Sequence, residues 1–375
     1  MILASAALGL SAANRLRAGQ RAAQGPLIIN ALGGIENPNL ELGREPNANP
    51  VDTSTPDVDA RALRDAHTSG LAAVNVTLGY VGGGGDPFEY TLATIRVWDE
   101  IVRRNSRDLV KVLEARDIEG ARRAGRIGVI YGFQNGAMMG NDAARADLFA
   151  RLGVRVIQLT YNPANQLGDG CMAPQNRGLT PFGREVVARL NAARIMVDLS
   201  HSGERTCLDA ARVSRAPISI NHTGCRALAD LPRNKTDEEL RLVASRGGFV
   251  GIFFMPFLKV DGHPHAADVV AHIEHALEVC GEDHVGIGTD GDVSTIDDLG
   301  AYRAHLAQEV ANRHRAGLGA AGERADTYPF VVDLRGPGQF RELAALLERR
   351  GHSETRIEKI LGANFLRFAQ DTWGA

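Results

Sequence analysis

The sequence has few of the features that mark several large classes of protein. Only four of its 375 residues are cysteine, and no two of these form a CxxC pair, so neither a disulfide framework nor a cysteine-based zinc site is expected. The formal net charge of −3 gives no overall attraction to nucleic acid or to an anionic membrane. After residue 25, no apolar run approaches the roughly 20 residues that span a bilayer. The four cysteines, which we interpret as free or core thiols, are Cys171, Cys207, Cys225 and Cys280.

The first 25 residues, MILASAALGLSAANRLRAGQRAAQG, differ from the rest of the chain. They have an apolar segment from Ile2 to Ala13, followed by arginines. A secretory leader normally has its positive charges before the apolar region, and here none precede it. Two interpretations stay open: the tail of an export leader, which predicts a periplasmic or secreted protein, or a disordered N-terminus of a protein that is otherwise cytoplasmic. Residues 26–375 are predicted to form one domain.

From Pro26 onward, short apolar runs alternate with segments that have helical periodicity. The runs are nearly continuous in apolar residues, which is typical of strands in a parallel sheet covered on both faces. The segments 180–193 and 266–281 have apolar residues three and four apart, as on an amphipathic helix. This alternation predicts an α/β fold, specifically a (β/α)8 TIM barrel, with a doubly wound open sheet as the alternative. The eight runs cover residues 27–30, 71–78, 126–133, 154–162, 194–201, 217–222, 248–255 and 284–290.

Two histidines stand at the ends of successive predicted strands. His201 ends the run in IMVDLSHSG, and His222 ends the next run in PISINHTG. Active sites of TIM barrels lie at the carboxyl ends of the strands, and neighbouring strands are about 5 Å apart, so the two imidazoles could converge on one metal ion. Asp290, at the end of the eighth run, supplies a carboxylate at the same rim.

Several longer motifs resemble the membrane dipeptidase (renal dipeptidase) family of zinc metallohydrolases. They are QLTYNPANQLGDG at 158–170, GLTPFGREVVARLNAARIMVDLSHSG at 178–203, APISINHTGCRALADLPRNKTDEELRLV at 216–243, HIEHALEVCGEDHVGIGTDGDV at 272–293 and ILGANFLRF at 360–368. The resemblance implies a metal-bearing TIM barrel that hydrolyses dipeptides. It assigns the histidine pair to His201 and His222, the late-strand aspartate to Asp290, and the arginine that holds the substrate carboxylate to Arg233.

The chain also departs from the pattern of that family. The HxD motif of the first strand, which gives a histidine and an aspartate to one of two zinc ions, falls on Leu32 and Gly34 in IINALGGIE. The bridging glutamate of the family falls on Gln134, and the histidine after the fourth strand falls on Tyr161. One of the two family metal sites therefore lacks nearly all its side chains.

These departures favour one zinc ion over two. A glutamine amide at position 134 cannot supply the negative charge that a bridging glutamate gives to a pair of dications. We expect His201, His222 and Gln134 to hold the single ion. Asp290 then becomes a candidate general base, and Tyr161 a candidate hydrogen-bond donor to the substrate oxyanion. Glu36, just past the first strand, is the one nearby carboxylate that could restore a second metal site.

Three functions remain in competition at this point. The first is a dipeptidase-like hydrolase that cleaves a dipeptide or a related amide with a free carboxylate. The second is a non-hydrolytic enzyme acting on an amino-acid-like molecule, and the third is a catalytically silent binding protein. All three predict a small-molecule partner and leave a homodimer open. His272 and His275, three apart in a helical segment, are predicted to lie on a solvated face outside the barrel.

Overall fold

The structure is a computed structural model that describes residues 25–42 and 58–374. Residues 1–24, which the sequence leaves open as the tail of an export leader or as a disordered N-terminus, lie outside the described residues. Within them, no helix is both long and apolar enough to cross a membrane.

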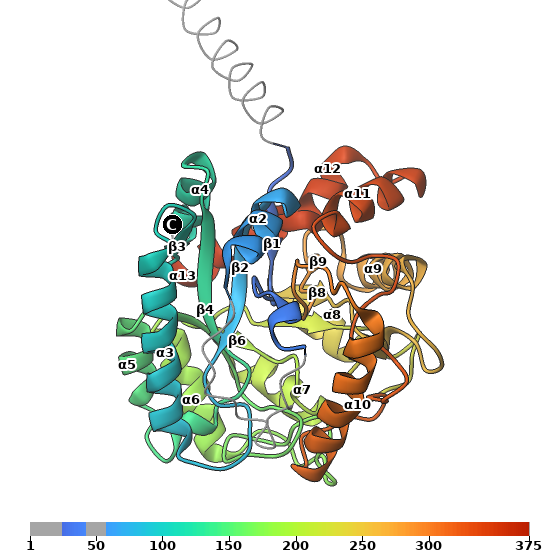
Figure 1. Cartoon of the computed structure of the whole chain (residues 1–375). Helices are drawn as coiled ribbons and strands as arrows, with labels where there is room; N and C mark the ends of the chain where they lie inside the picture. Colours follow the sequence, from blue (N-terminus) through green and yellow to red (C-terminus); the bar gives the residue numbers. More distant parts are fainter. Residues whose placement is uncertain (1–24, 43–57, 375) are drawn as a thin grey trace, which may run out of the picture.

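Parallel strands form the centre of the molecule, and helices surround them (Figure 1). Eight strands follow one another in the order β1, β2, β4, β5, β6, β7, β8, β9, and β3 pairs with β4 outside this path. The described strands are β1 (Ile28–Asn30), β2 (Leu71–Leu78), β3 (Leu109–Lys111), β4 (Ile127–Phe133), β5 (Val154–Gln158), β6 (Met196–Asp198), β7 (Ser219–Thr223), β8 (Phe249–Ile252) and β9 (Val285–Ile287).

Contacts between the first and last strands close the ring. Ala31 N donates to Ile287 O (3.0 Å), Asp290 N donates to Leu32 O (2.9 Å), and Gly34 forms a parallel bridge with Asp292. The eight runs predicted from the sequence coincide with these eight strands, so the prediction of a (β/α)8 barrel is confirmed. β3, which lies outside the path of the eight strands, was not predicted.

Helices follow most of the strands and cover the outside of the barrel. Thr180 caps α6: its side chain accepts a hydrogen bond from Gly183 N, and Pro181 opens the helix. The described helices are α2 (Ala60–Ser69), α3 (Pro87–Arg104), α4 (Ala115–Arg123), α5 (Arg145–Arg151), α6 (Pro181–Ala192), α7 (Glu204–Val213), α8 (Asp237–Ser245), α9 (Ala266–Cys280), α10 (Leu299–Arg315), α11 (Gln339–Arg349), α12 (Glu354–Glu358) and α13 (Asn364–Trp373).

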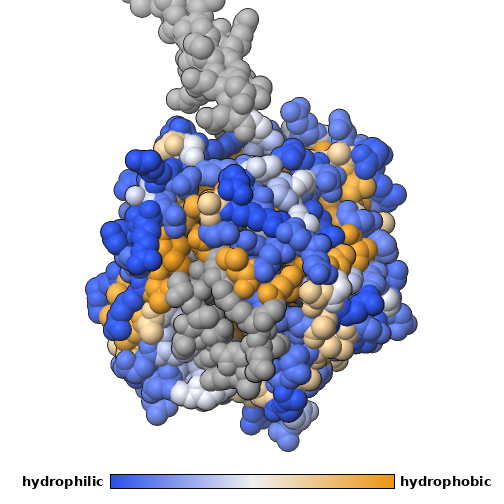
Figure 2. Space-filling model, viewed as in Figure 1, coloured by the Kyte–Doolittle hydropathy of each residue, from blue (hydrophilic) through white to orange (hydrophobic). Residues whose placement is uncertain are grey.

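The surface agrees with this layering. Figure 2 shows hydrophilic residues around the periphery of one face and hydrophobic residues gathered between them. The outward side chains of the strands, such as Val74, Val129 and Ile157, pack with helix residues in one large core cluster. A smaller cluster lies at the amino ends of the strands, where Phe249 and Met196 contact residues of α13.

Helix α13 covers the amino ends of the barrel and should contribute strongly to its stability. The Phe368 ring is fully buried and stacks on Phe249 with ring centroids 6.0 Å apart. Phe368→Ala should lower the free energy of unfolding by about 3–5 kcal/mol, because it removes a buried ring and leaves a cavity. Urea unfolding measures the change, with Gln370→Ala at an exposed position of α13 as the control. Equal midpoints for the two variants would contradict this role of α13.

Candidate active site

The predicted site residues come from the carboxyl ends of five strands. Gln134 follows β4, Tyr161 follows β5, His201 follows β6, His222 lies within β7, and Asp290 follows β9. A cavity of about 320 Å³ opens at this rim, and its lining includes four of these residues and Arg233. His222 is fully buried and is not part of the lining. Four of the five predicted site residues therefore line the cavity, and His222 contacts it through His201.

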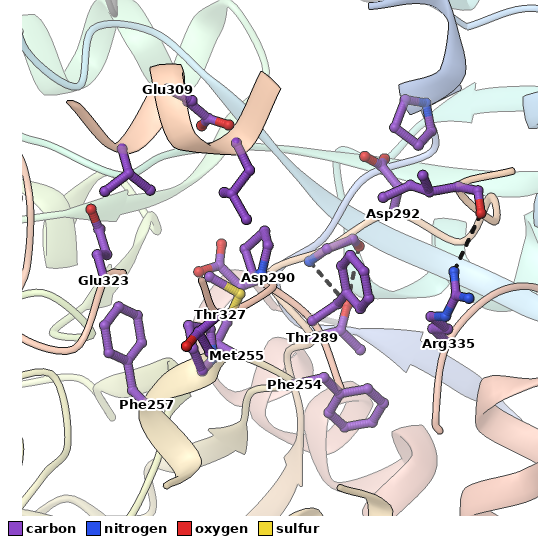
Figure 3. A pocket seen from close by; sticks show the side chains of 18 of the residues that line it. Phe254, Met255, Phe257, Thr289, Asp290, Asp292, Glu309, Glu323, Thr327 and Arg335 are labelled. Carbon is purple, nitrogen blue, oxygen red and sulfur yellow. Dashed lines mark hydrogen bonds between the residues drawn. The ribbon is translucent and has the colours of Figure 1, made fainter. Parts of the chain in front are cut away.

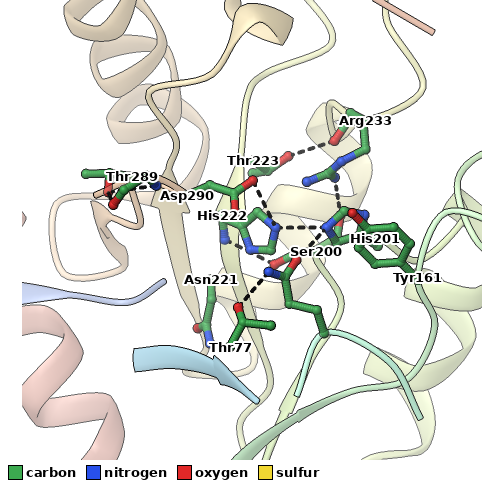
Figure 4. A network of polar contacts seen from close by, with 12 residues as sticks. Thr77, Tyr161, Ser200, His201, Asn221, His222, Thr223, Arg233, Thr289 and Asp290 are labelled. Atoms are coloured by element: carbon green, nitrogen blue, oxygen red, sulfur yellow. Dashed lines mark hydrogen bonds and ion pairs between the residues drawn. The ribbon is translucent and has the colours of Figure 1, made fainter. Parts of the chain in front are cut away.

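The two histidines face each other through their Nε2 atoms, which are 3.0 Å apart (Figure 4). Two ligands at 2.0–2.1 Å from one ion can lie no more than about 4.2 Å apart, so this separation is compatible with a shared ion. Burial lowers the pKa of both imidazoles well below the usual value, and the nearby Arg233 guanidinium acts in the same direction. Both rings are therefore neutral and have a lone pair available.

Asn162 fixes which nitrogen of His201 carries the proton. Its Nδ2 donates to Leu318 O (2.8 Å), so its Oδ1 faces His201 Nδ1 at 2.7 Å and accepts a hydrogen bond from it. A neutral His201 with a proton on Nδ1 has its lone pair on Nε2. The backbone carbonyl of Leu318 thus orients the imidazole through one amide.

Gln134 adds a second acceptor beside that lone pair. Its Nε2 donates to Thr77 Oγ1 (2.7 Å), which turns its Oε1 toward His201 Nε2 at 3.0 Å. Whichever nitrogen of His222 carries the proton, the Gln134 oxygen and His201 Nε2 face each other as two acceptors. A cation between them removes this repulsion, so the donor set fits a metal ion.

Asp290 lies next to the histidine pair in an uncommon backbone conformation. Its φ is +57°, in the left-handed region, where a residue other than glycine is strained. Its Oδ2 is 3.8 Å from His222 Nε2. Burial raises the pKa of Asp290 to about 6, although the Arg233 and Arg313 guanidiniums oppose the shift. A strained backbone and a raised pKa at the rim of a cavity are features that functional residues often share.

Tyr161 stacks on His201 and is held by an ion pair from α10. The ring centroids of Tyr161 and His201 are 4.2 Å apart with an interplanar angle of 25°. Arg313 Nη2 donates to the Tyr161 hydroxyl (3.1 Å) and also to Glu323 Oε1 (2.8 Å). Burial raises the pKa of Tyr161, so its hydroxyl keeps the proton and can donate it in a hydrogen bond.

Arg233 is buried at one side of the cavity, with 1% of its surface exposed. Its Nη1 donates to Ser200 O (2.7 Å), and its guanidinium lies over the rings of Phe253 and Phe257. Its Nη2 has no hydrogen-bond partner among the described residues. A guanidinium with an unpaired nitrogen has the donor geometry that suits a carboxylate.

On the side of the site next to the first strand, Leu32 and Gly34 occupy the positions of the HxD motif of the family. Leu32 is buried, and a Cβ added at Gly34 would lie 2.0 Å from Asp292 Oδ1. Glu36 contributes its backbone N–H, which donates to Asp292 Oδ1 (2.9 Å). Within residues 25–42 and 58–374, no group of three His, Cys, Asp or Glu side chains is arranged to hold a metal.

Comparison with known proteins agrees with the fold and the motifs. The structure has the architecture of a TIM-barrel hydrolase with its site at the carboxyl ends of the strands. Residues 31–317 match the model of the membrane dipeptidase family, peptidase family M19. The chain belongs to the membrane dipeptidase family.

Individual relatives support this assignment. A dipeptidase, tcpJ, from Claviceps purpurea is 31% identical over 263 residues, which cover 69% of this chain and 54% of that longer protein. An uncharacterized Klebsiella pneumoniae protein from the region 5' of pqqA is 26% identical over 77% of this chain and 98% of its own length. Among solved structures, an amidohydrolase from Pseudomonas aeruginosa has a TM-score of 0.76 and 30% identity, covering 94% of this chain and 98% of its own.

Sequence reasoning missed several residues of the site. Asn162 comes one residue after Tyr161, and Asp292 comes two residues after Asp290. Both positions lie just past the carboxyl end of a strand, and this location could have identified them as candidate site residues. Arg313 gave no signal, since it comes from a helix remote in sequence. The prediction for His272 is wrong: it is 1% exposed, its Nδ1 accepts from Cys225 N (2.9 Å), and burial lowers its pKa to about 4.

Proposed function

We propose that this protein is a metal-dependent dipeptidase-like hydrolase that uses one zinc ion and cleaves a dipeptide or a related amide with a free carboxylate. The observation that supports the proposal is the close approach of two imidazole nitrogens and an amide oxygen: His201 Nε2 lies 3.0 Å from His222 Nε2 and 3.0 Å from Gln134 Oε1. Imidazole nitrogens suit zinc, which takes three protein ligands in its catalytic sites and leaves a fourth position open. A bound zinc ion would supply Lewis acidity, which lowers the pKa of water and polarises a carbonyl.

The side chains around this point have the chemistry that amide hydrolysis requires. Asp290, with a pKa of about 6, takes a proton from water as the water oxygen forms a bond with the carbonyl carbon. Tyr161 donates its hydroxyl hydrogen to the oxyanion that develops, and its own oxygen accepts from Arg313. The C–N bond then breaks, and Asp290 returns the proton to the leaving amine. The products are a carboxylate and an amine.

Arg233 would hold the substrate while these bonds change. Its unpaired Nη2 can donate to a carboxylate, and its Nη1 bond to Ser200 O fixes the guanidinium in place. A fixed anchor keeps the scissile carbonyl near the reacting groups and reduces the entropy cost of the reaction.

Metal content and product analysis test this function together. Elemental analysis of freshly purified protein should give one equivalent of zinc per chain, and a panel of dipeptides should give free amino acids as products. Removal of the metal with a chelator should abolish the reaction, and added zinc should restore it. A metal-bearing protein that converts dipeptides to other products would indicate the non-hydrolytic enzyme. A protein without metal and without turnover would indicate the binding protein.

Asn162 should determine the metal affinity, although it does not contact the ion. Asn162→Ala removes the acceptor for His201 Nδ1–H, so the ring can change its tautomer or rotate. Loss of such a supporting hydrogen bond typically weakens metal binding about 10- to 100-fold. Competition with a chromogenic chelator measures the Kd. Cys171→Ser is the matched control, because its Sγ also contacts Asn162 Oδ1 (3.3 Å) but does not orient the imidazole. An unchanged Kd in Asn162→Ala would show that the tautomer is set elsewhere.

A further inference from the structure

We propose that the interior of the barrel binds one alkali-metal cation, Na⁺ or K⁺, through side-chain oxygens of Asn75, Gln158, Asp198 and Asn221. None of these four residues lines the cavity that Figure 3 shows. All four side chains are at most 1% exposed. Each has an oxygen without a hydrogen-bond partner among the described residues, namely Asn75 Oδ1, Gln158 Oε1, Asp198 Oδ2 and Asn221 Oδ1. Buried polar atoms are nearly always paired in proteins, so four such oxygens point to a ligand.

Three of these residues lie side by side on adjacent strands. Ile157 faces outward into the core between strands and helices, so Gln158, which follows it on β5, faces into the barrel. Asp198 on β6 is paired in register with Gln158. Asp198 Oδ1 accepts a hydrogen bond from Asn221 N on β7 (3.0 Å), so the carboxylate also lies next to Asn221.

Asn75 reaches the same region from β2, across a glycine. A Cβ added at Gly132 of β4 would lie 2.1 Å from Asn75 Oδ1, so the amide occupies the space of a side chain on the strand between β2 and β5. At Gly251 of β8 and Gly288 of β9, an added Cβ would lie 2.1 and 1.9 Å from Asn221 O. Branched apolar side chains usually fill the interior of a TIM barrel. Here polar groups from four strands and glycines from three others leave room for an ion among oxygen atoms.

The charge of these groups favours a monovalent cation. The hydrogen bonds of the Asp198 carboxylate all go to Oδ1 and come from neutral donors: Ser200 N (3.0 Å), Ser200 Oγ (2.5 Å) and Asn221 N (3.0 Å). Buried charges are normally paired or bound to a metal, and carboxylate and amide oxygens are the ligands that hard cations prefer. One carboxylate among neutral amides balances a single positive charge. One water molecule, in contrast, has two hydrogens for four acceptors.

The site would support the strand ends that carry the histidine pair. Ser200 Oγ donates to Asp198 Oδ1 and accepts from His222 N (3.0 Å). A cation that holds Asp198 therefore also fixes the backbone on which His222 stands, beneath the proposed zinc site. The inference needs no substrate and goes beyond the proposed hydrolase function.

Thermal unfolding of the zinc-loaded protein in NaCl, KCl and choline chloride at equal ionic strength tests the proposal. The midpoint should be roughly 2–5 °C higher in NaCl or KCl, because an alkali cation binds only the folded state and choline is too large for the site. Gln158→Met keeps the size of the side chain but removes its oxygen, so it should lose most of this difference. Gln339→Met is the matched control and should keep it: Gln339 is also buried with an unpaired Nε2, but it lies in α11.

Crystals of protein purified in RbCl give an independent measurement, because Rb⁺ replaces an alkali cation and scatters anomalously. A peak among the four oxygens, together with a salt-dependent midpoint that Gln158→Met loses, would support the proposal. Equal midpoints in the three salts, an undiminished difference in Gln158→Met, or ordered water without an anomalous peak would overturn it. If Gln158→Met does not fold, the anomalous map decides alone. A protein without hydrolase activity would leave each of these readouts unchanged.

Discussion

The double variant His201→Ala, His222→Ala should lose the full equivalent of metal, and its kcat/KM should fall by about 10³-fold or more. A catalytic metal contributes several kcal/mol to transition-state stabilisation, and the variant loses this contribution. The two Nε2 atoms are 3.0 Å apart and both rings are neutral, so a metal ion that displaces the proton between them would be held by both imidazoles. Gln134 cannot hold the ion alone through one amide oxygen. Elemental analysis and kinetics on the same preparation measure both losses.

His275→Ala is the matched control for the histidine pair. His275 lies on α9, where its Nε2 pairs with Asp237 at 2.7 Å, far from the cavity lining. This variant should keep one equivalent of zinc and the activity of the parent. Two equivalents of metal in the parent protein would contradict the assignment, as would one full equivalent retained after both His201 and His222 are removed.

Arg233→Lys should raise KM roughly 10- to 100-fold for substrates with a free C-terminal carboxylate, with a smaller effect on kcat. The lysine ammonium can replace the bond to Ser200 O, but it then lacks the second nitrogen, Nη2, which has no partner among the described residues. A dipeptide amide, which has no carboxylate, should show little difference between parent and variant. Initial-rate kinetics on the two substrates measure the contrast.

Arg226→Lys controls for a general effect of replacing an arginine near the site. Arg226 lies on the same loop but pairs with Glu204 (3.2 Å) outside the cavity. An unchanged KM in Arg233→Lys would remove Arg233 from the substrate site. Thermal unfolding of each variant shows whether the fold is preserved, which matters because the Arg233 side chain is among the most deeply buried in the described structure.

The barrel and much of its rim could be predicted from the sequence because they depend on local patterns. Nearly continuous apolar runs separated by amphipathic helices specify parallel strands buried on both faces, and the carboxyl ends of such strands must meet at one rim. Those runs end on His201 and Asp290, contain Tyr161 near their end, or are followed directly by Gln134, so the convergence of these residues on one side of the barrel followed from topology. The same reasoning placed His222 on the neighbouring strand, but it could not show that the ring is fully buried.

Other parts of the site depend on contacts between segments far apart in the chain. Arg313 reaches Tyr161 across 152 positions, and Leu318 O orients Asn162 across 156. His272 has the spacing of a surface residue, yet the loop at Cys225 covers it and uses its lone pair. Such contacts are set by how helices and loops pack, which no local periodicity records.

The sequence by itself therefore determined the strand order, the edge of the barrel where the site lies and the loss of the first-strand ligands, because each follows from the type of residue at a position along a strand. The tertiary structure alone decided where the side chains point. It turned the lone pairs of His201 and Gln134 toward one another, and it brought Asp292 into the space left by Gly34. Side-chain direction depends on rotamers and on hydrogen bonds with distant partners, and these exist only once the barrel has closed.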